Sequence, residues 1–235
     1  MGSTVVLIPG LICNELAWAD VANLLSDMGL DVVIADVSEP NTITAMAQSV
    51  LDSVSGDLIP LGHSMGGRVA LEMVRLAPKR IKGLGLIATG AHPLAEGETE
   101  KREAVIELAN EQGMHVLVEK WLPPMVAKGF PEEEPVRYKN LFDSCVSAGE
   151  EQHERQIRAL VNRPNAVPLL AEINTPTILI AGEEDAWSTP QQHAEMQSKM
   201  VKAQTKLVVL NTGHFVQYEA PQLFTETVLG WLKEL

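Results

Sequence analysis

Short apolar runs alternate with longer amphipathic segments along most of this chain, and that alternation limits the possible folds more than any other feature. Strands buried on both faces are expected at residues 4–8, 31–35, 58–62, 81–88, 177–181 and 206–210. Amphipathic helices are expected between them, at residues 16–28, 43–53, 65–76, 191–200 and 221–235. Right-handed crossovers through such helices return each strand parallel to its neighbours. The sequence therefore predicts an α/β fold, with helices on both faces of a mostly parallel sheet of about six strands.

Residues 91–168 interrupt this rhythm with a helical, charge-rich segment. Its residues 98–103 read Glu-Thr-Glu-Lys-Arg-Glu, and the prolines that follow Trp121 divide it into pieces. The segment leaves the sheet where a strand ends, and the binding sites of α/β proteins lie at the carboxyl ends of their strands. We therefore predict a core of residues 1–90 and 169–235, with residues 91–168 as a helical cap or lid. A helical elaboration with a solvated outer face is the alternative.

The segment Gly62-His63-Ser64-Met65-Gly66 joins an expected strand directly to an expected helix and fits the pattern Gly-x-Ser-x-Gly. Such a turn is sharp, so side chains at positions 62 and 66 would crowd it. The turn strains the serine backbone and lifts the hydroxyl to a helix N-terminus, where the dipole favours developing negative charge. We interpret Ser64 as a nucleophile, and an ordinary glycine-rich turn between a strand and a helix is the alternative.

A serine hydroxyl needs a base that removes its proton during attack, and six histidines compete for that role. His214 lies in the loop directly after the last expected strand, so a carboxyl-end loop presents it. The side chain of His63 is expected to point away from the serine hydroxyl. Surface or core positions are expected for the others, which are His92, His115, His153 and His193. His214 is therefore the predicted base.

The imidazole in turn needs a carboxylate that fixes its tautomer and stabilises the imidazolium. Asp185 follows the expected strand at 177–181, and Glu183 and Glu184 compete with it in the same loop. The other strand end that could present an acid leads into residues 89–91, which contain no carboxylate. Asp185 is therefore the predicted acid, and the chain order nucleophile, acid, base matches that of hydrolases with this turn.

Attack on a carbonyl builds an oxyanion, which backbone N–H groups must stabilise. The N–H of Met65, directly after the serine, is one expected donor. The turn at residues 9–12, after the first strand, is expected to supply the second donor from Leu11. Both pocket lining and core packing stay open for three aromatic residues near these loops, Trp18, Trp187 and Phe215.

Composition excludes several other classes of function. The 235 residues carry a formal net charge of −13, so a nucleic acid or an anionic membrane surface would be repelled. No apolar stretch approaches the roughly 20 residues that span a bilayer, and the first residues lack the basic region of a signal peptide. Cys13 and Cys145 form neither a disulfide framework nor a zinc spacing. We expect a cytoplasmic protein with no cofactor and no metal.

These motifs together resemble the α/β-hydrolase superfamily over nearly the whole chain. The resemblance is strongest to the small capped carboxylesterases related to pimeloyl-ACP methyl esterase and to the meta-cleavage C–C hydrolases. It implies a catalytic triad with two oxyanion donors, which are Ser64, Asp185 and His214 with Leu11 and Met65. Two features depart from the family. Few residues precede the first strand, so the N-terminal strand pair of many relatives is expected to be trimmed, and Pro9-Gly10 stands where relatives often carry His-Gly.

The function implied is hydrolysis of carboxylic esters with small or medium acyl chains, through an acyl-enzyme on Ser64. A C–C bond or thioester hydrolase with the same triad is an alternative, for which Arg68 is the nearby cation that an acidic substrate would need. A ligand receptor with slow turnover is another. The serine excludes the haloalkane dehalogenases and epoxide hydrolases of this fold, which use an aspartate there. A small-molecule ester is the expected partner, and both a monomer and a dimer stay open.

Overall fold

A parallel sheet of six strands lies at the centre of the protein. The structure is a computed structural model and describes residues 2–235. The strands are β1 (Thr4–Ile8), β2 (Val32–Ile34), β3 (Leu58–His63), β4 (Leu84–Ile87), β5 (Thr177–Gly182) and β6 (Thr205–Leu210). Their order across the sheet is β2-β1-β3-β4-β5-β6, and every neighbouring pair is parallel. The predicted α/β fold with about six strands is confirmed.

Burial on both faces explains why continuous apolar runs form most of these strands. All residues of β1, β3, β4 and β5 are buried, which is typical of a parallel sheet covered by helices. The edge strands β2 and β6 are only partly buried. In the register, Leu7 of β1 pairs with Ile34 on one side and with Leu61 on the other. The carboxyl ends of the strands therefore meet at one edge of the sheet.

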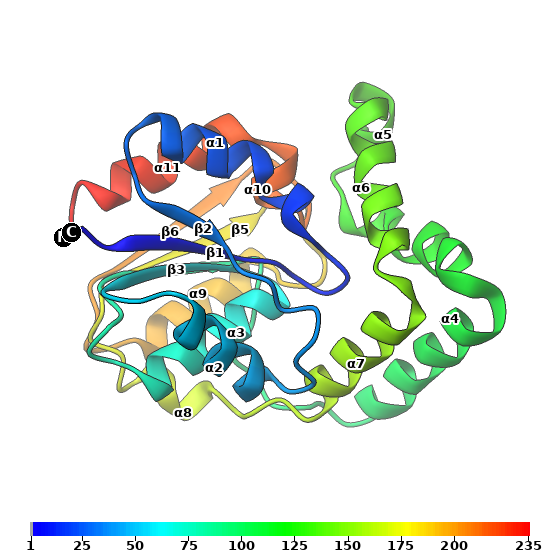
Figure 1. Cartoon of the computed structure of the whole chain (residues 1–235), viewed down its shortest axis with the longest axis horizontal. Helices are drawn as coiled ribbons and strands as arrows, with labels where there is room; N and C mark the ends of the chain where they lie inside the picture. Colours follow the sequence, from blue (N-terminus) through cyan, green and yellow to red (C-terminus); the bar gives the residue numbers. More distant parts are fainter. Residues whose placement is uncertain (1) are drawn as a thin grey trace.

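Helices cover both faces of this sheet (Figure 1). On one face α1 (Ala19–Asp27) packs against α11 (Pro221–Leu232), and on the other face lie α2 (Ile43–Ser53), α3 (Met65–Leu76) and α9 (Pro190–Lys199). Successive strand residues point to opposite faces. Leu7 thus belongs to the first hydrophobic core, whereas Val6 and Ile8 belong to the second.

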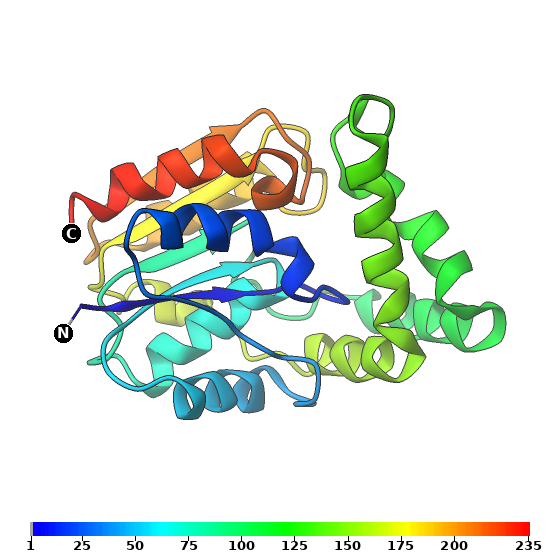
Figure 2. The ribbon, with the colours of Figure 1, turned by 45° about the horizontal axis from the view of Figure 1, so that its top comes forward.

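The residues between β4 and β5 form a separate helical layer beyond one end of the sheet (Figures 1 and 2). We call residues 91–168 the insertion. It contains α4 (Glu98–Trp121), α5 (Phe130–Glu133), α6 (Pro135–Ser147) and α7 (Gly149–Val161), and α8 (Val167–Leu170) begins at its end. The strands point toward this layer, whereas both chain ends lie on the opposite side of the core. Within α4, Gly113 has a φ of +84°, which divides the helix by a kink.

Two expected elements are shorter than their sequence patterns indicate. The expected helix at 16–28 is divided at Trp18, whose φ of −123° is not helical. A 3₁₀ turn, η1 (Glu15–Ala17), precedes Trp18, and the Asn14 side chain caps it by accepting the Leu16 N–H. The expected strand at 81–88 is reduced to β4, and Ile81 forms only an isolated bridge.

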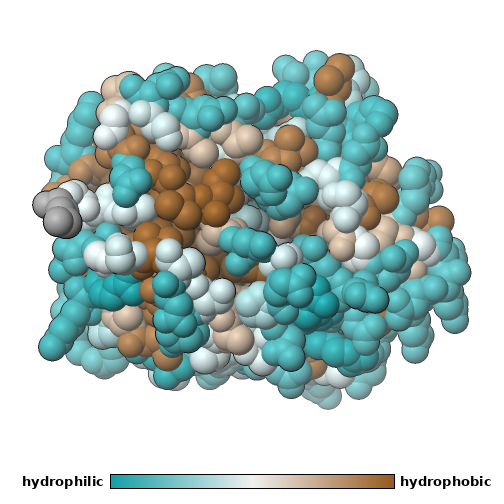
Figure 3. Space-filling view, viewed as in Figure 1, coloured by the Kyte–Doolittle hydropathy of each residue, from teal (hydrophilic) through white to brown (hydrophobic). Residues whose placement is uncertain are grey.

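Hydrophilic side chains cover most of the face shown in Figure 3. Apolar surface gathers over the middle of the core, where β1 and β2 lie. A hollow of about 680 Å³ lies beside β2, with Asp31, Val33 and Pro40 in its lining. It contains no predicted catalytic residue. No helix within residues 2–235 is both long enough and apolar enough to cross a membrane.

Candidate active site

Ser64 lies on the turn between β3 and α3, in a backbone conformation that residues with side chains rarely adopt. Its φ is +54° and its ψ is −114°, and strain of this kind costs on the order of 1–3 kcal/mol. The Ser64 N–H donates to the Ile87 carbonyl at 2.9 Å, and the Thr89 hydroxyl donates to the Ser64 carbonyl at 2.6 Å. The end of β4 therefore holds the serine in its strained state.

The glycines on either side of Ser64 leave no room for a side chain. A Cβ atom at Gly62 would lie 2.2 Å from the carbonyl oxygen of Gly66. A Cβ atom at Gly66 would lie 2.2 Å from the carbonyl oxygen of Ile8. Both contacts are with backbone atoms, which cannot turn aside as a flexible side chain can. The predicted crowding at positions 62 and 66 is confirmed, and it reflects the close approach of α3 to β3 at Gly62 and to β1 at Gly66.

Ser64, His214 and Asp185 form one hydrogen-bonded chain at the carboxyl edge of the sheet. The Nε2 atom of His214 lies 2.9 Å from the Oγ atom of Ser64, and its Nδ1 atom lies 2.7 Å from Oδ2 of Asp185. His214 and Asp185 are buried, whereas Ser64 is half-buried. An imidazole whose Nδ1–H donates to a carboxylate has Nε2 free to accept the serine proton.

The surroundings of Asp185 favour its ionised form. Burial by itself would raise the pKa of this carboxyl. The hydrogen bond with His214 and those from the N–H groups of Ser188 and Trp187 outweigh burial, and they hold the pKa below its usual value. Asp185 is therefore an anion, and in this form it can orient the ring of His214.

The two glutamates that compete with Asp185 lie elsewhere. Glu183 and Glu184 are both exposed, and Glu184 accepts a hydrogen bond from the N–H of Lys128 at 2.9 Å. The loop after β5 thus brings the aspartate to His214 and leaves the glutamates at the surface. Within residues 2–235, no group of three or more His, Cys, Asp or Glu side chains is arranged to hold a metal ion.

The other histidines make no hydrogen bond with the Ser64 hydroxyl within the described chain. His63 is buried, and its Nε2–H donates to the His214 carbonyl at 3.0 Å. Burial lowers the pKa of His63 to about 3, so its ring is neutral at physiological pH. His193 is buried and accepts the Thr89 N–H at 3.2 Å. The remaining three belong to the insertion, where His153 is buried and His92 and His115 are exposed.

Both segments that were predicted to supply oxyanion donors lie against Ser64. Met65 is the first residue of α3, and Leu11 follows Gly10 in the turn after β1. A Cβ atom at Gly10 would lie 3.3 Å from Cβ of Ser64, so this turn passes directly beside the serine. Within residues 2–235 the N–H groups of Leu11 and Met65 donate to no protein acceptor, whereas the Ile12 N–H is engaged. Both predicted donors are therefore not engaged by the described part of the protein.

The loop that carries His214 is fixed by the insertion. The His214 N–H donates to the Met125 carbonyl at 2.7 Å. A Cβ atom at Gly213 would lie 2.5 Å from the backbone nitrogen of Ala127, so the two backbones are in direct contact. No sequence pattern indicates this contact, because its partners lie on segments far apart in the chain.

Glu219 carries a half-buried carboxylate that no sequence motif marks. Its Oε2 accepts from the N–H groups of Ala127 and Gly213, both at 2.9 Å, and its Oε1 accepts from the Phe215 N–H at 3.0 Å. Burial raises the pKa of Glu219, and these three N–H groups oppose the increase. The carboxylate, at the end of the short helix α10 (Val216–Glu219), thus ties both neighbours of His214 to the insertion.

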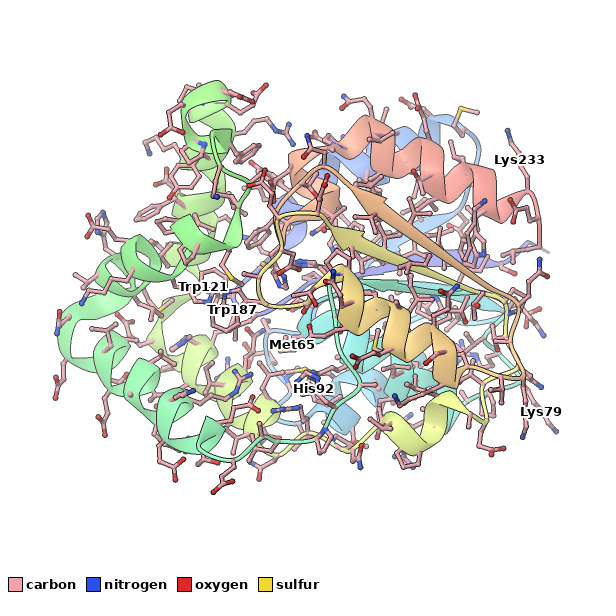
Figure 4. All side chains as sticks on the ribbon, turned by 180° about the vertical axis from the view of Figure 1, so that it is seen from behind. Met65, Lys79, His92, Trp121, Trp187 and Lys233 are labelled. Carbon is pink, nitrogen blue, oxygen red and sulfur yellow. The ribbon has the colours of Figure 1, made fainter. Side chains whose placement is uncertain are left out.

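The aromatic residues near the site separate into two groups. Trp18 and Phe215 are fully buried and belong to the core. Trp187 is 56% exposed, and Figure 4 shows it with Trp121 of α4 in the region where the insertion and the core meet. The Trp121 ring packs edge-on against Phe215, with centroids 6.1 Å apart. Of the three aromatic residues left open by the sequence, Trp187 is therefore the one that is not part of the core.

Known proteins share this fold and sequence pattern. The profile of the "Alpha/beta hydrolase family" matches residues 5–227. The carboxylesterase YbfK of Bacillus subtilis (strain 168) is 22% identical over 231 residues, which cover 93% of this chain and 74% of that protein. A thermophilic esterase from Thermogutta terrifontis has a solved structure with a TM-score of 0.89 and 24% identity, covering 100% of this chain and 90% of the esterase chain.

A third relative is much longer than this chain. The dihydrolipoyllysine-residue acetyltransferase component of the acetoin cleaving system of Pseudomonas putida is 27% identical over 180 residues. The match covers 74% of this chain but 45% of that protein, so the chain spans less than half of the relative's length. The family profile, in contrast, covers nearly the whole chain, and the six-stranded fold agrees with it. The predicted resemblance is confirmed, and this protein belongs to the alpha/beta hydrolase family.

Proposed function

We propose that this protein hydrolyses carboxylic esters with small or medium acyl chains through a covalent acyl-enzyme on Ser64. The observation that carries the proposal is the hydrogen-bonded chain from Ser64 through His214 to Asp185, with distances of 2.9 and 2.7 Å. Membership of a hydrolase family and similarity to a carboxylesterase support hydrolytic chemistry at this site.

In the first half of the reaction, Oγ of Ser64 attacks the ester carbonyl carbon while Nε2 of His214 takes the hydroxyl proton. Asp185 stabilises the imidazolium that forms. The carbonyl oxygen becomes an oxyanion, which the N–H groups of Leu11 and Met65 stabilise at the N-terminus of α3. When the C–O bond to the alcohol breaks, His214 returns the proton to the leaving oxygen, and the acyl group stays on Ser64.

In the second half, a water molecule replaces the alcohol. His214 takes a proton from this water as its oxygen attacks the acyl carbon, and the same N–H groups stabilise the second oxyanion. The bond to Oγ then breaks, Ser64 regains its proton from His214, and the carboxylic acid leaves. One water is consumed for each ester, and the protein returns to its starting state.

The surroundings of Arg68 favour a neutral ester over an acidic substrate. An anionic substrate would need a free cation near Ser64. The Arg68 guanidinium is instead engaged by His92, donating to its carbonyl at 2.9 Å and lying 3.2 Å from its ring Nε2. The net charge of −13 acts in the same direction, because it repels anions.

We also propose that the insertion is the cap of this site, over a catalytic core of residues 1–90 and 169–235. Three observations support this division: the insertion faces the carboxyl ends of the strands, touches the His214 loop, and packs Trp121 against Phe215 of the core. Specificity for the acyl chain would then lie mainly in the side chains of residues 91–168.

Covalent labelling combined with an acyl-chain series tests the proposal. We expect a fluorophosphonate to modify Ser64, as mapped by mass spectrometry, and p-nitrophenyl esters of short to medium chains to be hydrolysed. Ser64→Ala should lower kcat by about 10³-fold or more while the circular dichroism spectrum is unchanged. Labelling at another residue, or equal rates for Ser64→Ala and wild type, would contradict the proposal. Labelling of Ser64 without ester turnover would favour a ligand receptor with slow turnover. Faster hydrolysis of thioesters than of esters would favour a thioester hydrolase.

A further inference from the structure

Gln156, on helix α7 of the insertion, is bonded to the turn that carries Leu11. Its side chain is fully buried. The Oε1 atom accepts the Ile12 N–H at 2.7 Å, and the Nε2 atom donates to the Val37 carbonyl at 3.3 Å. Because both ends of the amide have partners, its orientation is fixed. A residue of the insertion thus reaches the turn beside the nucleophile.

Ile12 occupies a backbone conformation that needs such support. Its φ is +49°, and it is 1% exposed. A positive φ is a strained state for a β-branched side chain and persists only where the surroundings impose it. Inside the turn, the Cys13 N–H donates to the Gly10 carbonyl at 3.3 Å. Without Gln156 the buried Ile12 N–H would lose its partner, and the turn could relax toward ordinary backbone angles.

A second helix of the insertion holds the far end of the same turn. The Ser144 hydroxyl of α6 donates to Oδ1 of Asn14 at 2.7 Å. The same oxygen accepts the Leu16 N–H at 3.0 Å, which starts the 3₁₀ turn η1. Residues 12–14 are therefore held from outside the core by α6 and α7 together.

We propose that Gln156 is a positioning residue for the oxyanion site. Through the Ile12 N–H it fixes the turn that directs the neighbouring Leu11 N–H toward the developing oxyanion at Ser64. This inference rests on the proposed function of Ser64. It gives the insertion a part in stabilising the transition state, in addition to covering the site. Gln156 touches no reacting atom, so its effect must appear in kcat more than in KM.

Two substitutions at position 156 and one at its neighbour separate this role from simple packing. Gln156→Leu removes both hydrogen bonds at similar volume. Gln156→Glu keeps an oxygen that can accept the Ile12 N–H, and its carboxyl, protonated in this buried site, can donate to the Val37 carbonyl as the amide does. Arg155→Met is the matched control, because Arg155 lies on the same helix and donates to the Ser38 carbonyl at 3.0 Å. The control therefore weakens the adjacent contact between α7 and the core without touching Ile12.

The readouts are ester kinetics and the affinity for a phenylboronic acid, whose anionic adduct on Ser64 places an oxygen at the oxyanion position. For Gln156→Leu we expect kcat to fall about tenfold to a hundredfold, less than the full loss of one donor. The boronate affinity should weaken by a similar factor, whereas KM changes by less than about threefold. Gln156→Glu should recover most of the loss, and Arg155→Met should stay within about twofold of wild type.

Equal losses in Gln156→Leu and Arg155→Met would overturn the inference, as would a loss confined to KM with unchanged boronate affinity. If Gln156→Leu does not fold, the more flexible Gln156→Met takes its place in the same comparison. Failure of the proposed function is a separate result, because wild type would then show no labelling of Ser64 by fluorophosphonate.

Discussion

At the scale of single residues, backbone crowding sets the geometry around Ser64. The absence of a side chain at Gly66 lets α3 approach the end of β1, and the absence of one at Gly10 lets the Leu11 turn pass beside the serine. Gly230, in the last helix, is a useful contrast, because no atom lies within 4 Å of the position that its Cβ would take. Glycine is therefore required for steric reasons at positions 10 and 66 but not at position 230.

Substitution of Gly66 and of Gly230 by alanine should have opposite effects on the free energy of unfolding. In Gly66→Ala the new Cβ meets the Ile8 carbonyl oxygen at 2.2 Å, and we expect a loss of about 2–3 kcal/mol in the free energy of unfolding. Gly230→Ala should gain about 0.5–1 kcal/mol, because alanine loses less backbone entropy in a helix. Urea unfolding of both variants measures the difference. A Gly66→Ala variant as stable as wild type would show that the turn between β3 and α3 can relax to admit a side chain.

Single residues also show where sequence reasoning ends. Ser64, Asp185 and His214 could be identified because each follows a strand in a loop at the same edge of the sheet. Glu219 and Gln156 could not, because they act on backbone N–H groups of distant segments. Such contacts depend on how the insertion packs against the core, and a local pattern of residue types does not predict that packing.

At the scale of elements, one ion pair joins the two ends of the helical insertion. Arg163, just beyond α7, donates through both terminal nitrogens to Glu98, the first residue of α4, at 2.9 and 2.7 Å. The Arg163 side chain is 1% exposed and also donates to the carbonyls of His92, Pro93 and Leu160. The guanidinium is thus buried with Glu98 as its counter-ion, and the pair fixes the base of the insertion.

Removing this counter-ion should destabilise the protein in a pH-dependent way. Burial would raise the pKa of Glu98, but hydrogen bonds from Arg163, the Ala95 N–H and Arg102 lower it from 4.5 to about 2. A lowered folded-state pKa contributes stability that is complete above pH 4.5 and is lost as the pH falls toward 2. At pH 7 we expect Glu98→Gln to lose about 3 kcal/mol, since a buried charge is left unpaired.

Urea unfolding at pH 7 and at pH 3 measures this effect, and the gap between wild type and Glu98→Gln should narrow at the lower pH. The control is Asp143→Asn, which removes the exposed partner of Lys139 in α6 and should cost less than about 1 kcal/mol. A gap between wild type and Glu98→Gln that is the same at both pH values would exclude Glu98 ionisation as its source.

Elements near Ser64 were predicted more accurately than those of the insertion. The helix expected at 65–76 matches α3, because the strained serine starts it and Pro78 follows its end. The prediction of a helix at 16–28 was wrong in its first turn, because α1 begins only at Ala19. There, burial of Trp18 prevails over helical propensity. In residues 91–168 the sequence indicates helices, but the kink at Gly113 and the packing of α4 on α6 and α7 depend on tertiary contacts.

At the scale of the whole molecule, 31 acidic residues against 18 basic ones leave a formal net charge of −13. Self-repulsion of such a charge destabilises the compact state, and salt screens it. We expect the free energy of unfolding at pH 7 to rise by on the order of 1 kcal/mol between about 10 and 200 mM NaCl. The increase should shrink at pH 5, where carboxylates begin to protonate. A decrease with salt at pH 7 would mean that attractive ion pairs outweigh the repulsion.

The bond from the His214 N–H to the Met125 carbonyl limits how this protein can be recombined with its relatives. A chimera that replaces residues 91–168 also replaces the acceptor of the backbone N–H of His214, the proposed general base. A donor segment of equal length and similar helices would therefore still have to place one carbonyl oxygen at the position of the Met125 carbonyl. Replacement of the insertion in this protein is thus constrained by main-chain geometry as well as by the fit of side chains.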